Sequence, residues 1–156
     1  VKASNLFIQL FVGNYYKGYN GENIPATSSL LLNPMGGWSD SNGNFYIADQ
    51  TRIRKVDAFG IMNTICGTGV SDFNADGAPA NATLVSHVKS VWGDSLGNLF
   101  YIDRNNQRLR KIDVNTSIVT TVVGGGVYRF NVENETGTSN RLSGSFMTGD
   151  SVGNLY

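Results

Sequence analysis

The chain has few of the residues on which disulfide-bonded, metal-binding and membrane proteins depend. Its 156 residues include a single cysteine, Cys66, a single histidine, His87, and three prolines. One cysteine excludes an internal disulfide, and one histidine cannot supply a zinc site built from several imidazoles. No apolar run approaches the roughly 20 residues of a membrane-spanning helix. We therefore expect no cofactor, no metal and no membrane insertion in this segment.

Charge is also scarce. Charged residues make up 15% of the chain, against about 25% in an average globular protein, and 12 basic residues balance 12 acidic ones. Nucleic-acid binders usually carry a basic excess, so the neutral balance argues against a nucleic-acid partner. What is abundant is glycine, with 19 residues, together with β-branched and aromatic residues. This composition favours strands joined by tight turns.

One sequence motif recurs along the chain. The turn motifs "DSNGN", "DSLGN" and "DSVGN" begin at Asp40, Asp94 and Asp150, which are 54 and 56 residues apart. Pro25 and Pro79 repeat the spacing of 54. In each motif, Asp binds backbone amides and Gly supplies the positive φ of a tight hairpin.

Each repeat divides into four short strands. We expect strands at 35–39, 45–48, 52–56 and 61–66 in one copy, and at 88–93, 99–102, 108–112 and 118–123 in the next. Residues 7–12 would end an earlier copy, and 145–149 would open a later one. Apolar residues fall on both faces of these strands, as in sheets that pack between neighbours. Four antiparallel strands repeating every fifty-odd residues are typical of a β-propeller blade.

Two stretches, "GNFYIADQTRIRKVD" from Gly43 and "GNLFYIDRNNQRLRKID" from Gly97, resemble the blades of the NHL-repeat family. The segments "YNGENIPATSSLLLNP" and "FNADGAPANATLVS" resemble the linkers of that family. The resemblance implies an all-β, six-bladed, TolB-like propeller. This chain would be an incomplete propeller: 1–13 ends one blade, 14–67 and 68–124 are each a linker and blade, and 125–156 starts another. Open blade edges would then favour self-association.

Residues that break the repeat are the better candidates for function, because recurring ones serve the architecture of every blade. The long connections between blades should share a face with the loops that join strands two and three. Loops on a rigid scaffold carry most binding function. We expect binding residues there at Tyr15, Tyr16, Lys17, Asp72, Phe73, His87, Arg104, Tyr128 and Arg129. An alternative for part of this set is structural: Tyr19, Phe73 and Phe130 recur and would pin the linker to the blade.

Two other recurring features have a structural and a functional interpretation. Trp38 and Trp92 occupy one position on the channel-lining strand, where they would form either a ligand platform or packing between blades; packing is the expected role. The "RIRK" and "RLRK" runs would form a phosphate-binding stripe or a set of ion pairs. We expect ion pairs of Arg54 with Asp49 and of Arg110 with Asp103.

Three glycosylation sequons begin at Asn81, Asn115 and Asn134. They favour an extracellular or cell-surface location. The leading hypothesis is a non-enzymatic propeller scaffold that binds a protein partner or another ligand through the loops of one face. The alternatives are a fragment of a metal-dependent lyase or lactonase-like enzyme whose active site lies in other blades, and an RNA-binding NHL domain.

Overall fold

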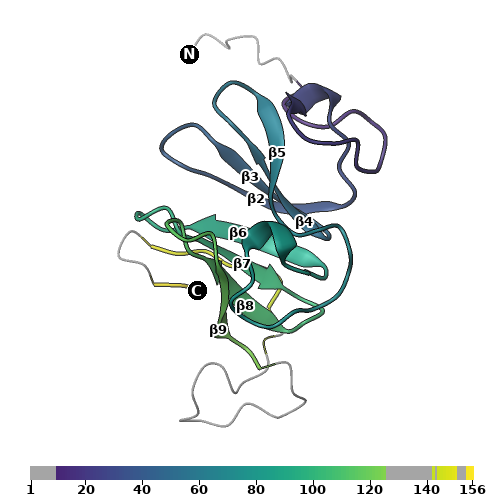
Figure 1. Cartoon of the computed structure of the whole chain (residues 1–156). Coiled ribbons are helices and arrows are strands. Elements are labelled where there is room, and N and C mark those ends of the chain that lie inside the picture. Colours follow the sequence, from purple (N-terminus) through teal and green to yellow (C-terminus); the bar gives the residue numbers. More distant parts are fainter. Residues whose placement is uncertain (1–9, 126–141, 143, 151–153) are drawn as a thin grey trace.

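A computed structural model describes residues 10–125, 142, 144–150 and 154–156. These residues form two antiparallel sheets, one after the other along the chain (Figure 1). The first sheet has the order β1-β5-β4-β3-β2, and the second has the order β6-β7-β8-β9. The strands of the first sheet are β1 (Ile24–Pro25), β2 (Pro34–Ser39), β3 (Phe45–Asp49), β4 (Arg52–Val56) and β5 (Ile61–Cys66). Those of the second are β6 (Val88–Gly93), β7 (Leu99–Asp103), β8 (Arg108–Ile112) and β9 (Val119–Val123).

The predicted all-β class and antiparallel four-strand units are confirmed. Every predicted strand of the two complete copies is present, with bounds that differ by one residue at most. We call the sheet β2–β5 blade one and the sheet β6–β9 blade two. Residues 10–12, the described end of the strand expected at 7–12, are not in a strand. The rest of that segment lies outside the described residues.

Hairpin turns between the first two strands of each unit form around the repeated aspartates. Asp40 Oδ1 accepts hydrogen bonds from the backbone N–H groups of Asn42 and Asn44, each at 2.9 Å. Asp94 Oδ1 makes the equivalent bonds with Leu96 (3.0 Å) and Asn98 (2.8 Å). These carboxylates therefore hold the turns, as the turn chemistry predicted.

The linkers add an element that the strand pattern did not predict. The first linker contributes β1, which pairs with the outer strand β5 (Ile24 opposite Met62), followed by the 3₁₀ helix η1 (Ala26–Ser28). The second linker places Pro79 in a bridge with Ile118 beside β9, followed by η2 (Ala80–Ala82). Each linker thus covers the outer edge of the blade that it precedes before it returns to the inner strand.

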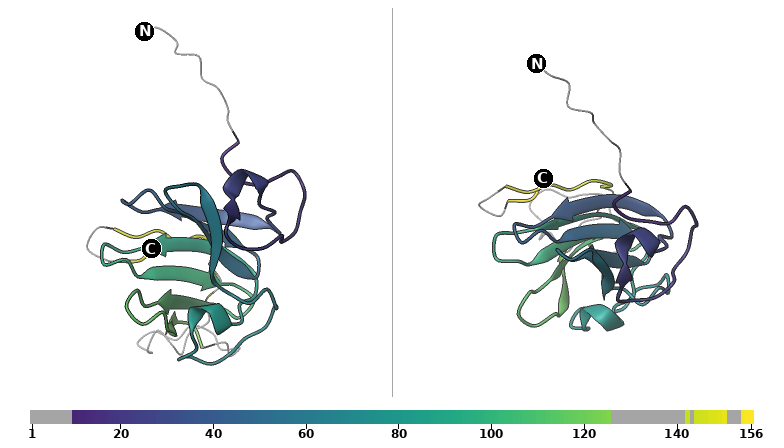
Figure 2. Two further views of the ribbon diagram at one scale, coloured as in Figure 1. Left: turned by 45° about the horizontal axis from the view of Figure 1, so that its top comes forward. Right: turned by 90° about the horizontal axis from the view of Figure 1, so that it is seen from above.

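The two blades lie side by side (Figure 2), and the core lies mainly between them. Ala48 and Ile53 of blade one pack in one cluster with Val88, Val91 and Tyr101 of blade two, and all five are buried. Between them, Cys66 Sγ lies 3.8 Å from the Tyr101 hydroxyl. Both faces of a blade strand are apolar because one of them packs on the neighbouring blade.

The two tryptophans pack forward, each onto the next copy of the repeat. Trp38 lies against Gly93, at a distance where a Cβ on Gly93 would collide with the indole ring. Trp92 lies against Gly149 in the same way. The indoles also contact the next strand of their own copy, with ring centroids 5.5 Å apart for Trp38–Tyr46 and 5.7 Å apart for Trp92–Phe100.

Helix is limited to single turns in the part of the chain that the structure describes, and none of it is long and apolar enough to cross a bilayer.

Candidate functional site

The candidate site is the side of the molecule on which β3 and β7 end and β4 and β8 begin. We call this side the top face. Val88 N–H, at the start of β6, donates to Gln50 O in the β3–β4 loop at 2.8 Å. This bond places the corresponding ends of the two blades on the same side. The linkers also return to their blades here, since Asn33 and Ser86 donate their N–H groups to Asp49 and Asp103 at the ends of β3 and β7. Lys17 of the first linker bridges Leu31, near this return.

The top face of blade two carries a longer loop than that of blade one. Residues 104–107 join β7 to β8, whereas only Gln50 and Thr51 join β3 to β4. Asn105 anchors the longer loop: its N–H donates to Ser86 O, and its Nδ2 to Ser86 Oγ, both at 3.1 Å. The Ser86 and Ser71 hydroxyls lie 2.7 Å apart. The loop is therefore held against both ends of the second linker.

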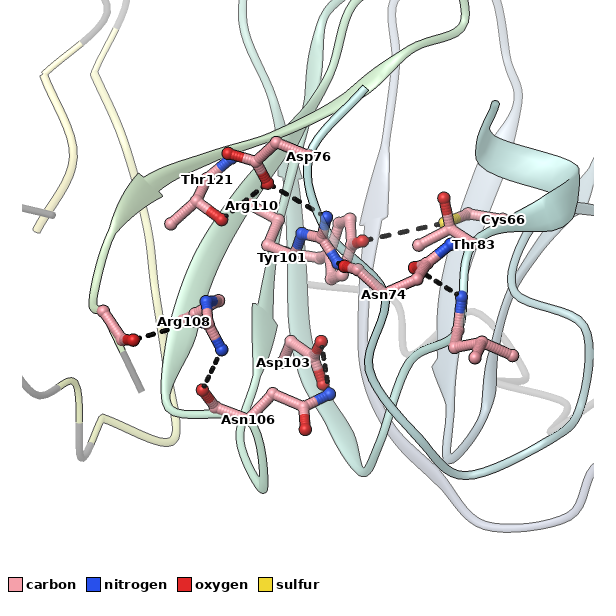
Figure 3. A network of polar contacts seen from close by, with 12 residues as sticks. Cys66, Asn74, Asp76, Thr83, Tyr101, Asp103, Asn106, Arg108, Arg110 and Thr121 are labelled. Atoms are coloured by element: carbon pink, nitrogen blue, oxygen red, sulfur yellow. Dashed lines mark hydrogen bonds and ion pairs between the residues drawn. The ribbon is translucent and has the colours of Figure 1, made fainter. Parts of the chain in front are cut away.

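Asp103 lies beneath this loop with none of its surface exposed. Its carboxylate accepts from Ser86 N–H at 2.8 Å. It also accepts from Asn106 Nδ2 at 2.9 Å (Figure 3). Asn106 Nδ2 also donates to Asp72 O at 3.0 Å, which ties the loop to the linker. Burial raises the pKa of Asp103 to about 6, although the two hydrogen bonds and the nearby Arg110 and Arg108 oppose the shift.

The arginines of β8 hold the second linker in place. The Arg108 guanidinium carbon lies 3.9 Å from the ring centroid of Phe73. Arg110, which is fully buried, donates through Nη2 to Asp76 Oδ1 at 3.1 Å and through Nη1 to Asn74 O at 3.3 Å (Figure 3). Asp76 also accepts from Thr121 N–H at 2.9 Å, on the strand beyond. The contacts of Arg108 and Arg110 with Phe73, Asn74 and Asp76 thus hold the linker across β8 and β9. We call this set of contacts the clasp.

Blade one repeats this clasp. The Arg52 guanidinium lies 3.9 Å from the ring centroid of Tyr19. Arg54 donates to Gly21 O at 2.9 Å and lies 3.9 Å from a carboxylate oxygen of Glu22. Glu22 in turn accepts from the hydroxyl of Thr64 at 2.5 Å.

The observed ion pairs of the two buried arginines correct one prediction. The buried arginines make their ion pairs with Glu22 and Asp76 of the linkers, whereas the strand pattern predicted Asp49 and Asp103. Those two aspartates instead accept backbone N–H groups at the start of the inner strand, from Asn33 and Ser86. The missed signal is the repeated order aromatic–Asn–x–acid, "YNGE" at 19–22 and "FNAD" at 73–76. It also occurs as "FNVE" at 130–133, outside the described residues.

The first group of predicted site residues lies in the linker before blade one. The side chains of Tyr15 and Tyr16 are 94% and 75% exposed, and Lys17 is exposed beside them. A shallow hollow, lined by 13–17 and 31–34, lies at this point. Tyr15 has φ = 52°, in the left-handed region that non-glycine residues seldom adopt.

The second group lies on the top face of blade two. Asp72 and Phe73 are in the linker, His87 precedes β6, and Arg104 is in the anchored loop. The ring of Phe73 contacts Arg108 and Arg110, so it occupies the pinning position considered as an alternative. Tyr128, Arg129 and Phe130 lie outside the described residues.

The channel candidates Trp38 and Trp92 line a cleft of about 560 Å³ together with the turns of Asp40, Asp94 and Asp150. This cleft is at the opposite end of β2 and β6 from the top face. Since each indole packs on the glycine of the next repeat, packing between repeats accounts for the tryptophans.

Two of the three sequon asparagines are described. Asn81 is exposed in η2, and Asn115 is exposed in the β8–β9 turn. Ala80 N–H donates to Ser117 O at 2.8 Å, so both sequons lie at the outer edge of blade two. Asn134 lies outside the described residues. Among the residues that the structure places, no three His, Cys, Asp or Glu side chains gather as a metal site.

Comparison with known proteins identifies the repeat. A family model described as "Teneurin NHL domain" matches residues 15–96, just over half of the chain. Teneurin-3 of Danio rerio is 35% identical over 95 residues, and Teneurin-3 of Mus musculus is 32% identical over 94. Each alignment covers 55% of this chain and 3% of the relative, so the chain spans a small part of these curated relatives.

A solved structure shows the same fold. It is a structural genomics protein of unknown function from Bacteroides thetaiotaomicron, with a TM-score of 0.60 and 23% identity, covering 72% of this chain and 29% of the other. The resemblance to NHL repeats is thereby confirmed, and the two described sheets are blades of an NHL-repeat β-propeller scaffold. The chain belongs to the teneurin NHL domain family.

Proposed function

We propose that this NHL scaffold binds a protein partner through the top face, with Tyr15 and Tyr16 as its anchors. The observation that carries the proposal is their exposure, 94% and 75%, on a linker that is itself immobilised. Tyrosine is enriched among residues that dominate binding energy at protein interfaces, because it offers a large amphipathic surface with few rotatable bonds.

The clasp supplies the rigidity that such an interface needs. Tyr19, four residues after Tyr15, stacks under Arg52 and donates from its hydroxyl to Glu22 at 2.8 Å. Because the linker is already ordered in the free protein, a partner does not have to order it on binding.

Photo-crosslinking tests this proposal. A photoreactive phenylalanine analogue is placed at position 15 or 16, and, as a matched control, at Phe59 in the β4–β5 turn at the other end of the sheet, which is 91% exposed. We expect a partner protein to crosslink from positions 15 and 16 and not from 59. With the purified partner, Tyr15→Ser together with Tyr16→Ser should weaken binding at least about tenfold. Equal crosslinking from position 59 and unchanged affinity of the double variant would contradict the proposal.

A further inference from the structure

We propose that His87, Lys89 and Arg104 form a binding site for carboxylate groups of an acidic segment of the partner. This inference rests on the proposed function of the top face and names the chemistry recognised on blade two.

The backbone brings the three side chains to one junction. Ser86 and Asn105 are joined by two hydrogen bonds of 3.1 Å, and His87 and Arg104 are the next residues in the chain from each of them. Lys89 follows His87 by two residues and is the second residue of β6. The intervening Val88 is fully buried, whereas His87 and Lys89 are partly exposed.

The positive charge at this junction is not neutralised within the described residues. Among the described residues, the basic side chains that form ion pairs are Arg54, Arg110 and Lys111. Desolvation, followed by the charges of Lys89 and Arg104, lowers the pKa of His87, and a bound carboxylate would oppose this shift.

The acids that flank this junction are already engaged, and Asp49 accepts from the N–H of Asn33 at 2.7 Å. Asp103 is buried and accepts from Ser86 N–H and Asn106 Nδ2. Asp72 Oδ1 accepts from the N–H of Phe73 at 2.8 Å. An external carboxylate is therefore the group that would complement the charges of Lys89 and Arg104 and favour the protonated form of His87.

The cluster also departs from the repeat. Asn33 and Met35 of blade one occupy the positions of His87 and Lys89, and the short β3–β4 loop has no equivalent of Arg104. His87 has φ = 63°, a left-handed conformation in which non-glycine residues are uncommon and which is often found at functional sites. Folding of a blade does not require these residues, because blade one folds without them.

A carboxylate-bearing peptide fits the cluster better than a nucleic acid. Arginine can bind one carboxylate through two parallel hydrogen bonds, and the charges of Lys89 and Arg104 match one or two acidic side chains. Single-stranded RNA recognition relies on open aromatic faces for base stacking. The aromatic ring in this linker, Phe73, is already in contact with Arg108 and Arg110.

His87 gives a direct test because it is the only histidine in the chain. Its ring signals are followed by NMR in the isotopically labelled chain while a hexaglutamate peptide is added, with hexaglutamine as the uncharged control. We expect hexaglutamate alone to shift the His87 ring signals and to raise its pKa, and added salt to weaken the effect. The variant Lys89→Gln with Arg104→Gln should bind about tenfold more weakly.

A matched variant removes the same number of charges elsewhere. Lys55→Gln with Lys111→Gln changes equivalent positions of β4 and β8 and should leave hexaglutamate binding unchanged. Identical shifts with hexaglutamate and hexaglutamine, equal weakening by the two double variants, or stronger binding of a uridine 20-mer than of hexaglutamate would each overturn the inference. If hexaglutamate does not bind while substitution of Tyr15 and Tyr16 still weakens partner binding, only this inference is wrong.

Discussion

Blade one and blade two have the same strand order and nearly the same register, yet their inner strands have different surroundings. In β2 the residues are exposed or half-exposed, whereas in β6 all but Lys89 are buried. Blade one packs on one side of β6, and residues of the third copy cover it further, with Ser90 Oγ donating to Met147 O at 3.3 Å. The inner strand β2, with one neighbouring blade, thus stays partly exposed, whereas β6, with residues of a repeat on each side, is core.

The largest expected difference between the blades is at the tryptophans. Trp92 is 9% exposed and Trp38 is only half-buried. Trp92→Ala should lower the free energy of unfolding by about 3–5 kcal/mol, because it leaves a cavity in a filled core. Trp38→Ala should cost roughly half as much, because water already reaches part of its ring. Chemical denaturation measures both, and equal losses would contradict the comparison.

A smaller effect is expected where the glycine meets the indole. Gly93→Ala puts a methyl group into the Trp38 ring and should cost about 1–3 kcal/mol through overpacking. The matched change in blade one is Ser39→Ala, since Ser39 is exposed, and it should change stability little. Adding Trp38→Phe to Gly93→Ala should recover part of the loss if the collision is its cause. Failure of this rescue in thermal unfolding would assign the loss to another contact.

The pH dependence of stability should carry a contribution specific to blade two. The pKa of Asp103 is raised to about 6 in the folded chain, so its contribution is fully present below about pH 4 and is lost as the pH rises through 6. The magnitude is on the order of 2 kcal/mol. The lowered pKa of His87 acts in the opposite direction and adds stability as the pH rises.

Two variants separate these contributions. Asp103→Asn should remove the loss of stability between pH 4 and pH 7, whereas His87→Gln should make that loss steeper. Unfolding midpoints measured across this range test both signs. A wild-type profile that Asp103→Asn leaves unchanged would show that the burial of Asp103 is not the cause.

The smallest expected difference concerns the clasp. Each buried arginine keeps a bond to a linker carbonyl in these variants, Arg110 to Asn74 O and Arg54 to Gly21 O. Asp76→Ala also removes a direct hydrogen bond from Arg110, whereas Glu22 lies 3.9 Å from Arg54. Asp76→Ala should therefore cost about 1–2 kcal/mol, and Glu22→Ala about 1 kcal/mol. Both acids are well exposed, which keeps the electrostatic part small. A larger loss for Glu22→Ala in urea denaturation would reverse this ranking of the two clasps.

Strands and turns could be predicted because their determinants are local. Asp40 and Asp94 bind amides two and four residues away, and apolar positions on both faces marked strands that pack between neighbours. The same locality put Tyr15, Tyr16, His87 and Arg104 in loops of one face. Their roles in binding remain predictions, as do the six-bladed closure and the use of the sequons.

The sequence by itself determined the period, the all-β class and the strands, because hydrogen bonds within a turn and side-chain alternation act over a few residues. Tertiary structure decided the partners of Arg54 and Arg110, the glycine against which each tryptophan packs and the burial of Asp103. Those contacts join residues 17 to 57 positions apart, such as Ser86 to Asp103 and Trp92 to Gly149. Which long-range neighbours meet depends on how linkers fold back and how blades stack, and neither is encoded in the pattern of a single strand.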